Sequence, residues 1–532
     1  MALLADIVSG DDLYVVVVRL GFFLAGPLLL TFIAQRLYFH PLSKYPGPWL
    51  NALSPIPEVL AIVAGRQHAY HRKLHERYGP VVRASPNELI FCGADAWDDI
   101  YGNKPGKPDM EKAPIQAGGL PQGIPARALT LAPWEDHVRQ RKAFAYPFSN
   151  TALLQQEPLV QKHVAKLIAE LQKLAEGDRP VNIAAWLTYT TFDMIGELCF
   201  AEPFGCLDQG QSTEWAQCVV NIANAGMYEQ ATRRIAGVGT RLQKFLAKWC
   251  IPKEFARWRQ DHFAKSKEKT MRRIADTDRD HKDFLYFVLK NNEAKSLLSE
   301  LEIVMNTALF IGAGSDTTAL MLTSWANMML RNPSSYQKLV AEVRGSLRSV
   351  QDITWQNVKD LEYLGAVSNE VFRICAPVPT NLCRVVPPEG AAIDGKFVPG
   401  GTTVSVSPWA ATHLDINWVD PLSFRPERWL GEGGGKYGRD KKHASQPFSY
   451  GPRGCIGKNL SQIEQRLIIC HLLYHFDMSN PTVGGGKEKD WEMEIAADKN
   501  KLWDLEDDMR HMKAWLVWQK PDLWVKLKEV ER

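Results

Sequence analysis

A single long helical segment limits the folds that are open to this chain of 532 residues. Ser299 and Glu302 have the spacing of a capping box, and helical periodicity then continues until Pro333. A helix of roughly 33 residues is about 50 Å long, which is enough to cross a whole domain. Because the chain shows no internal repeat and no dividing linker, we expect one large domain arranged around this helix.

The rest of the pattern predicts more helix than strand. Strand-like alternation is confined to short segments near the two ends, at 81–84, 88–91, 402–406 and 523–527. Amphipathic helical stretches fill the middle, at 159–174, 188–200 and 240–274. We therefore predict a mainly α fold with small β-sheets, an α+β arrangement within one domain.

An apolar segment at residues 13–35 precedes this domain. Its length matches what a helix needs to cross the hydrocarbon core of a membrane, and its flanks differ from those of a cleaved signal peptide. Arg19 and Pro27 interrupt it, so a buried or peripheral helix is the alternative. We expect a retained, single-pass transmembrane anchor.

The flanks of this segment predict its orientation. Acidic residues precede it and basic residues follow it, which places residues 1–12 in the lumen and the main body in the cytosol. Prolines at 41, 46 and 48 predict a stiff, extended hinge over residues 36–50. The cytosolic domain then covers residues 51–532, and the membrane we expect is that of the endoplasmic reticulum.

Composition excludes some classes of function. Lysine and arginine total 63 and aspartate and glutamate 60, so the net charge of +3 gives no reason to expect a nucleic-acid partner. The nine cysteines are odd in number and irregularly spaced, which fits neither a disulfide framework nor a zinc site. We infer a reducing compartment.

Cys455 lies in an unusual local context. It sits in a turn rich in glycine and proline, directly before an amphipathic helical pattern that contains Leu460, Ile463 and Leu467. The positive end of a helix dipole favours an anion, so we expect a lowered thiol pKa and a thiolate here. Neighbouring glycines let the backbone approach a large flat ligand. A structural cysteine in a tight turn is the alternative.

The segment 448–457 resembles the cysteine loop of the haem-thiolate monooxygenases, the cytochrome P-450 superfamily. Every fixed position of the signature Phe-x-x-Gly-x-Arg-x-Cys-x-Gly is matched. The resemblance implies haem b (iron protoporphyrin IX), with Cys455 as the axial metal ligand and Arg453 on a haem propionate. It also places Phe448 beside the sulfur and Gly457 under the ring. In such proteins the thiolate donates electron density that favours cleavage of the O–O bond.

The centre of the long helix resembles the family's oxygen-activating motif. The glycine-containing segment 312–318 carries Asp316 and Thr317 at the matching positions. A hydroxyl both donates and accepts hydrogen bonds, so the resemblance implies that Thr317 relays protons during catalysis with Asp316 behind it. The alternative is a threonine bonded within its own helix and an aspartate in an ion pair.

Other basic residues match positions that hold the haem propionates in the family. Arg384 corresponds to the second propionate-binding arginine, although an exposed loop arginine is the alternative. His137 and Arg141 are one helical turn apart and match a variant in which histidine replaces tryptophan as a propionate donor. Glu370 and Arg373 resemble the structural Glu-x-x-Arg pair, whose expected partner is the arginine at position 428.

The sequence at residues 40–48 and 378–387 resembles that of fungal microsomal members that oxidise specialised (secondary) metabolites. The resemblance implies O2 and a lipophilic small molecule as substrates, and electrons from NADPH through a flavin reductase. An acidic reductase would dock on the basic residues 436, 439, 441, 442 and 458, and a solvated loop without a partner is the alternative. Substrate would contact four largely apolar stretches, at 106–131, 308–317, 376–382 and 515–519.

Two other functions share this cofactor. One is a haem-thiolate isomerase or dehydratase that rearranges a peroxide or similar substrate without a reductase. The other is a non-catalytic haem sensor. The intact Asp316 and Thr317 pair favours the oxygen-inserting monooxygenase, because a sensor needs no proton relay and the isomerases often depart from this motif.

Overall fold

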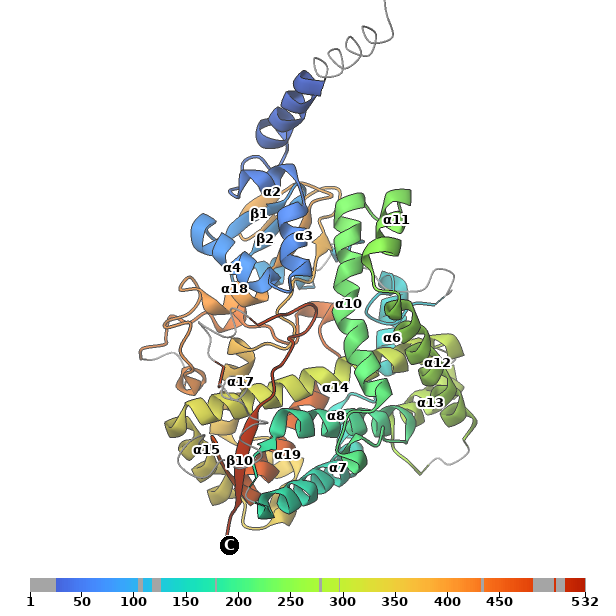
Figure 1. Cartoon of the computed structure of the whole chain (residues 1–532), viewed down its shortest axis with the longest axis vertical. Coiled ribbons are helices and arrows are strands. Elements are labelled where there is room, and N and C mark those ends of the chain that lie inside the picture. The colour runs from blue at the N-terminus through green and yellow to red at the C-terminus, as the bar shows by residue number, and fades with distance from the viewer. Residues whose placement is uncertain are drawn as a thin grey trace, which may run out of the picture.

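The computed structural model describes residues 25–103, 109–116, 126–177, 179–276, 280–295, 297–431, 435–481, 502–503 and 512–531. Helices form most of the body, and helix α14 (Glu300–Arg331) crosses it (Figure 1). This arrangement confirms the predicted mainly α fold with small sheets.

The helices before α14 cover the N-terminal half of the chain. They are α2 (Trp49–Leu53), α3 (Ile56–Val63), α4 (Gln67–Tyr78), α5 (Ala96–Tyr101), α6 (Trp134–Phe144), α7 (Asn150–Glu176), α8 (Ile183–Phe200), α9 (Cys206–Gln209), α10 (Glu214–Ala236), α11 (Arg241–Cys250), α12 (Glu254–Ala275) and α13 (Phe284–Lys295). Those after it are α15 (Pro333–Ser346), α16 (Trp355–Val358), α17 (Glu362–Ile374), α18 (Pro408–His413) and α19 (Lys458–His475).

Three small sheets pack beside the helices. The largest has the strand order β1-β2-β8-β5-β3, in which β2 and β8 are parallel and the other neighbours antiparallel. The second has the order β4-β10-β9, and the third pairs β6 with β7. Their strands are β1 (Val81–Ser85), β2 (Glu88–Phe91), β3 (Glu111–Lys112), β4 (Val181–Asn182), β5 (Arg384–Val385), β6 (Ala391–Ile393), β7 (Lys396–Val398), β8 (Thr403–Val406), β9 (Phe476–Ser479) and β10 (Trp524–Glu529).

Helix α14 begins and ends where its sequence predicts. The Ser299 hydroxyl accepts a bond from the Glu302 N–H at 3.3 Å, and the Glu302 carboxylate accepts from the Ser299 N–H at 2.9 Å. This capping box satisfies N–H groups that the first turn of a helix leaves without partners. A Cβ at Gly314 would lie 2.8 Å from Ile195 of α8, so this glycine lets the two helices pack closely.

Two predicted helical stretches have different boundaries. The stretch 240–274 is split into α11 and α12, because Pro252 cannot continue the first helix. Helix α7 begins at Asn150, nine residues before the predicted start, and runs through Pro158. Its true start is capped by the Ser149 side chain, which accepts a bond from the Ala152 N–H.

The predicted anchor falls largely outside the described residues. Residues 25–34 form a helix that projects from the body, and the π-helix η2 (Gln35–Phe39) follows it (Figure 1). Across the part of the chain that the structure describes, every helix is too short or too polar to cross a membrane. The expected span at 13–35 includes residues 13–24, which the structure does not describe, so it stays a prediction.

The prediction of an extended hinge over residues 36–50 was wrong for most of this segment, since residues 36–39 lie in η2, residues 40–45 form a turn and α2 begins at Trp49. Both Leu42 and Tyr45 are buried in the cluster that packs on the largest sheet. The Tyr45 hydroxyl donates to the carbonyl of Phe397 at 2.6 Å. Proline content alone gave no sign that these apolar side chains would hold the segment against the body.

Candidate functional site

The loop around Cys455 closes tightly on itself and on helix α5. The Cys455 N–H donates to the carbonyl of Phe448 at 2.8 Å, which returns the chain to the start of the loop. Gly451 has φ of +70°, and a Cβ there would collide with the carbonyl oxygen of Tyr101. Only glycine suits this position, both for its backbone angle and for the close approach. The loop therefore holds Cys455 two residues before the N-cap of α19.

Cys455 differs from most other cysteines of the chain in its exposure. All nine cysteines are described and free, and seven are buried, whereas Cys455 and Cys250 are exposed. Although Cys455 is exposed to solvent, the protein atoms packed around its thiol desolvate it and raise its pKa, and the Gly457 N–H and the Arg141 charge act in the other direction. The expected lowering by the start of the helix is thus outweighed by desolvation in the protein alone. A cation bound at the sulfur would favour the thiolate.

Basic side chains from three separate segments converge around this loop. Arg453 donates to the carbonyl of Ala132 at 3.1 and 3.2 Å, just before α6. Arg141 of α6 donates to the carbonyl of Gly454 at 2.5 Å. Arg384 of β5 is buried, with its guanidinium 5.0 Å from the centre of the Tyr101 ring. The predicted propionate-binding residues are therefore brought together by α6, β5 and the cysteine loop.

These cations act on one another. Burial, and then the charges of Arg453 and Arg141, lower the pKa of His137 to about 4, and Arg384 also contributes. A neutral imidazole still carries one N–H donor. The Nδ1 atom of His137 is buried without a hydrogen-bond partner among the described residues.

The residues fit a haem. The two haem propionates would bring negative charge to the cluster of His137, Arg141, Arg384 and Arg453. One propionate would also give the buried His137 Nδ1 atom a hydrogen-bond partner. A Cβ at Gly457 would lie 3.9 Å from the Cys455 sulfur, so the backbone leaves the sulfur accessible on that side. A thiolate at Cys455 would hold the iron.

The centre of α14 is accessible, although most of this helix is buried. Ala313 is exposed and Thr317 is partly exposed. The Thr317 hydroxyl donates to the carbonyl of Ala313 at 2.7 Å, which leaves its oxygen free to accept a further bond. Asp316 forms an ion pair with Lys520, and both side chains are largely buried. The bond of Thr317 within its own helix and the ion pair of Asp316 both match the structural alternative. The Thr317 oxygen can nevertheless still accept a hydrogen bond.

Sequence reasoning missed Lys520 and Glu464. Lys520 precedes β10 and is far from Asp316 in sequence, so no local pattern could reveal their pairing. Glu464 of α19 is fully buried and accepts a bond from the Thr318 hydroxyl at 3.1 Å. A signal for Glu464 was present, because helical spacing puts it on the same apolar face as Leu460 and Leu467.

Burial raises the pKa of Glu464 to about 8, with only the Thr318 hydroxyl opposing it. The carboxyl is therefore held protonated at neutral pH, between the centre of α14 and the helix that follows Cys455. Because the folded pKa lies above the ordinary value of 4.5, the associated stability is complete below that value and is lost as pH rises through about 8.

Replacing Glu464 by glutamine is expected to remove this pH dependence. The native protein should lose unfolding free energy by roughly 1.4 kcal/mol per pH unit between about 4.5 and 8, and the variant should not. Thermal unfolding of both proteins between pH 5 and 8.5 measures this, with the exposed Glu529→Gln as control. A difference in Tm that stays constant over this range would contradict the account.

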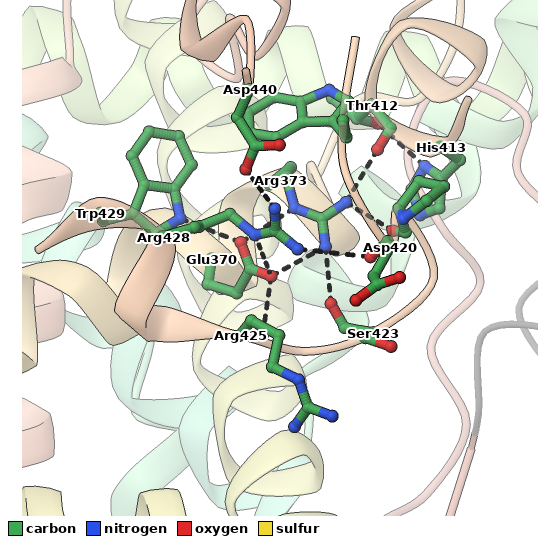
Figure 2. A network of polar contacts seen from close by, with 12 residues as sticks. Glu370, Arg373, Thr412, His413, Asp420, Ser423, Arg425, Arg428, Trp429 and Asp440 are labelled. Carbon is green, nitrogen blue, oxygen red and sulfur yellow. Dashed lines mark hydrogen bonds and ion pairs between the residues drawn. The ribbon is translucent and has the colours of Figure 1, made fainter. Parts of the chain in front are cut away.

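The Glu-x-x-Arg pair is the centre of a buried polar network (Figure 2). Arg373 donates to both carboxylate oxygens of Glu370 at 2.8 and 2.9 Å, and Arg428 donates to Glu370 at 3.1 Å. The expected third member is thus confirmed. Burial opposes the charge on Glu370, yet Arg373 and Arg428 hold the pKa of Glu370 below its usual range. The indole of Trp429 donates to the same carboxylate at 2.9 Å.

Hydrogen bonds join some of the four stretches that we expect to contact substrate. Trp518 donates to the carbonyl of Ala376 at 2.9 Å, which joins the C-terminal segment to the 376–382 loop. Trp518 is 2% exposed and belongs to the core, so its role is packing. The stretch 106–131 is described only in part, and its Leu129 N–H donates to Asn306 of α14 at 2.8 Å.

Comparison with known proteins decides the family. The cytochrome P-450 family model matches residues 46–501. The chain belongs to the cytochrome P-450 family. The cytochrome P-450 monooxygenase aba2 of Botryotinia fuckeliana is 52% identical over 504 residues, covering 95% of this chain and 93% of the relative. ABA2 of Pyricularia oryzae, also a cytochrome P-450 monooxygenase, is 46% identical over 97% of both chains. The monooxygenase astA of Talaromyces wortmannii is 36% identical, over 92% of this chain and 93% of its own length.

This protein is therefore an enzyme, a cytochrome P-450 monooxygenase, and its family implies a haem-thiolate cofactor. When bound, that cofactor supplies the iron at which molecular oxygen is activated. The chain itself would hold the iron through Cys455 and bind the haem carboxylates with its basic cluster. The α14 centre would supply protons.

Proposed function

We propose that this monooxygenase uses O2, and electrons that a flavin reductase takes from NADPH, to oxidise a lipophilic small molecule of fungal secondary metabolism. The observation that carries the proposal is the pairing of two helices. Thr318, next to the candidate relay residue Thr317, is hydrogen-bonded to Glu464 on the helix that Cys455 precedes. The candidate relay and the candidate iron ligand are thus built on two helices that pack together.

Reductase dependence is supported by charge around the cysteine loop. Lys436, Arg439, Lys441, Lys442 and Lys458 are all exposed, and they lie in or beside the segment that leads to Cys455. Lys436 pairs with Asp420, and the others form a basic surface that complements an acidic partner.

Location at the endoplasmic reticulum is proposed on the apolar surface at one end of the body. The helix at residues 25–34, α2, α3 and α11 lie at this end in Figure 1. Large apolar side chains are exposed on all of them, among them Leu28, Trp49, Leu60, Phe245 and Trp249. Exposed apolar side chains gathered at one end of a protein are typical of a membrane contact. Retention in microsomal membranes after alkaline extraction tests an integral anchor, and full release would contradict it.

The test of the proposed activity begins with binding. Spectral titration of the purified haem protein with a library of lipophilic metabolites identifies candidate substrates. Each is then incubated with reductase and NADPH while NADPH, O2 and product are measured. Product that depends on both NADPH and O2 supports a monooxygenase. Conversion without either would instead indicate the isomerase or dehydratase, and binding without any product would indicate a sensor.

Thr317→Val is expected to retain haem while losing productive turnover. Valine keeps the shape of threonine and removes the hydroxyl that the relay needs, so product per NADPH should fall by about 10²-fold as peroxide rises. Thr323 makes the same bond within α14, to Ala319 at 2.7 Å, and is buried away from the exposed Ala313. Thr323→Val is therefore the matched control. Unchanged coupling of product to NADPH in Thr317→Val would refute the relay.

A further inference from the structure

Lys112 lies beside the propionate-binding candidates, and nothing in the sequence pattern singles it out. Strand β3 pairs with β5 so that Lys112 is opposite Arg384. The Ala113 N–H also donates to the carbonyl of Cys383 at 3.1 Å, which continues the pairing beyond the strand. Because side chains alternate along a strand, Glu111 is directed to solvent and Lys112 is partly buried.

The surroundings of Lys112 are strongly positive. Burial, and then the charges of Arg384 and Arg453, lower the pKa of Lys112 to about 7. Lys112 in turn contributes to the lowered pKa of His137. Carboxylates are sparse here, since Glu111 is 61% exposed and lies 3.8 Å from Arg453 rather than pairing with Lys112. Within the described ranges, no ion pair joins Lys112 to a carboxylate.

Burying a cation among other cations is unfavourable unless an anion joins them. Burial raises the pKa of the Asp109 carboxyl, which disfavours its charged form, and within the described residues no ion pair joins Asp109 to Lys112. The anions that suit this cluster are the two carboxylates of a haem, which the family implies. An ammonium on a flexible stem can reach either carboxylate as a point charge, whereas the arginines bind in a fixed fork geometry.

We propose that Lys112 is a further cation for the haem propionates, acting beside Arg384 and Arg453. This inference rests on haem binding at Cys455 and is independent of which substrate the enzyme oxidises. It predicts that Lys112 stabilises the haem-loaded protein and destabilises the protein without haem. A merely structural lysine would affect both forms alike.

The test uses the purified holoenzyme with haem itself as the probe. Lys112→Met should release haem to an excess of apomyoglobin about tenfold faster than the native protein, the loss expected for one charged hydrogen bond. Its haem reduction potential should also fall, because removing a nearby positive charge favours the ferric form. Lys112→Arg should preserve both properties. Lys528→Met, at an exposed lysine of strand β10, is the matched control and should leave both unchanged.

Thermal unfolding separates this role from a folding defect. The Tm of Lys112→Met without haem should equal or exceed that of the native apoprotein, and the gain in Tm on haem binding should be smaller. Native rates of haem release together with a native potential in Lys112→Met would overturn the inference. That result would not affect the proposed activity. A native protein that lacks the thiolate spectrum would instead overturn the proposed function itself.

Discussion

Replacing Arg373 by methionine is expected to abolish recovery of folded haem protein. Arg373 is fully buried and donates to Glu370 and to the carbonyls of Thr412, Pro421 and Ser423. Breaking a buried ion pair by removing one partner costs about 3–5 kcal/mol, and each unsatisfied acceptor adds about 1–3 kcal/mol. The sum reaches the total stability of an ordinary domain, about 5–15 kcal/mol.

The same network offers a matched control. The Arg425 backbone N–H donates to Glu370 at 2.9 Å, while its side chain is exposed and points away from the network (Figure 2). Arg425→Met should therefore yield native amounts of soluble protein with a native haem spectrum. Soluble yield, haem absorbance and Tm measure both variants. Arg373→Met protein that is soluble and unfolds at the native Tm would contradict the structural role of the network.

Cys455→Ala is expected to lose the thiolate signature completely. Alanine has no ligand atom for iron, so the reduced carbon monoxide spectrum characteristic of thiolate ligation should be absent and activity should fall to background. Some haem should remain bound, because the basic cluster on α6 and β5 and in the cysteine loop still binds its carboxylates. The reduced carbon monoxide difference spectrum measures the loss directly.

Cys250 provides the control for this variant, since it is the other exposed cysteine of the chain. Cys250→Ala should keep the native spectrum and activity. The remaining cysteines are buried, and desolvation raises the thiol pKa of Cys92, Cys375 and Cys470 to about 12, which makes them poor ligands. A native spectrum in Cys455→Ala would show that another residue holds the iron.

Local patterns were sufficient to predict much of this architecture. The capping box of α14 and the turn before α19 depend on residues a few positions apart, and the structure has both. The Glu370 pair with Arg373 is likewise one helical turn long. Its link to Arg428 came from family resemblance, since spacing alone could not join residues so far apart in the chain.

Contacts between distant segments were beyond the reach of these patterns. The pairing of Asp316 with Lys520, and of Lys112 with Arg384 across two strands, depends on how the whole chain folds. The thiol of Cys455 shows a second kind of effect that local patterns omit. A helix start predicted a lowered pKa, but the pKa depends on total desolvation, which only the packed structure contains.

Transfer of an oxygen atom from O2 to the substrate is the central claim, and isotope labelling measures it most directly. The purified enzyme is incubated with reductase, NADPH and a substrate found by spectral titration, under ¹⁸O2 in ordinary water. The account predicts a product that carries one ¹⁸O atom for each oxygen inserted, with none formed when NADPH is omitted. Product that forms without NADPH, or whose new oxygen comes only from water, would contradict it.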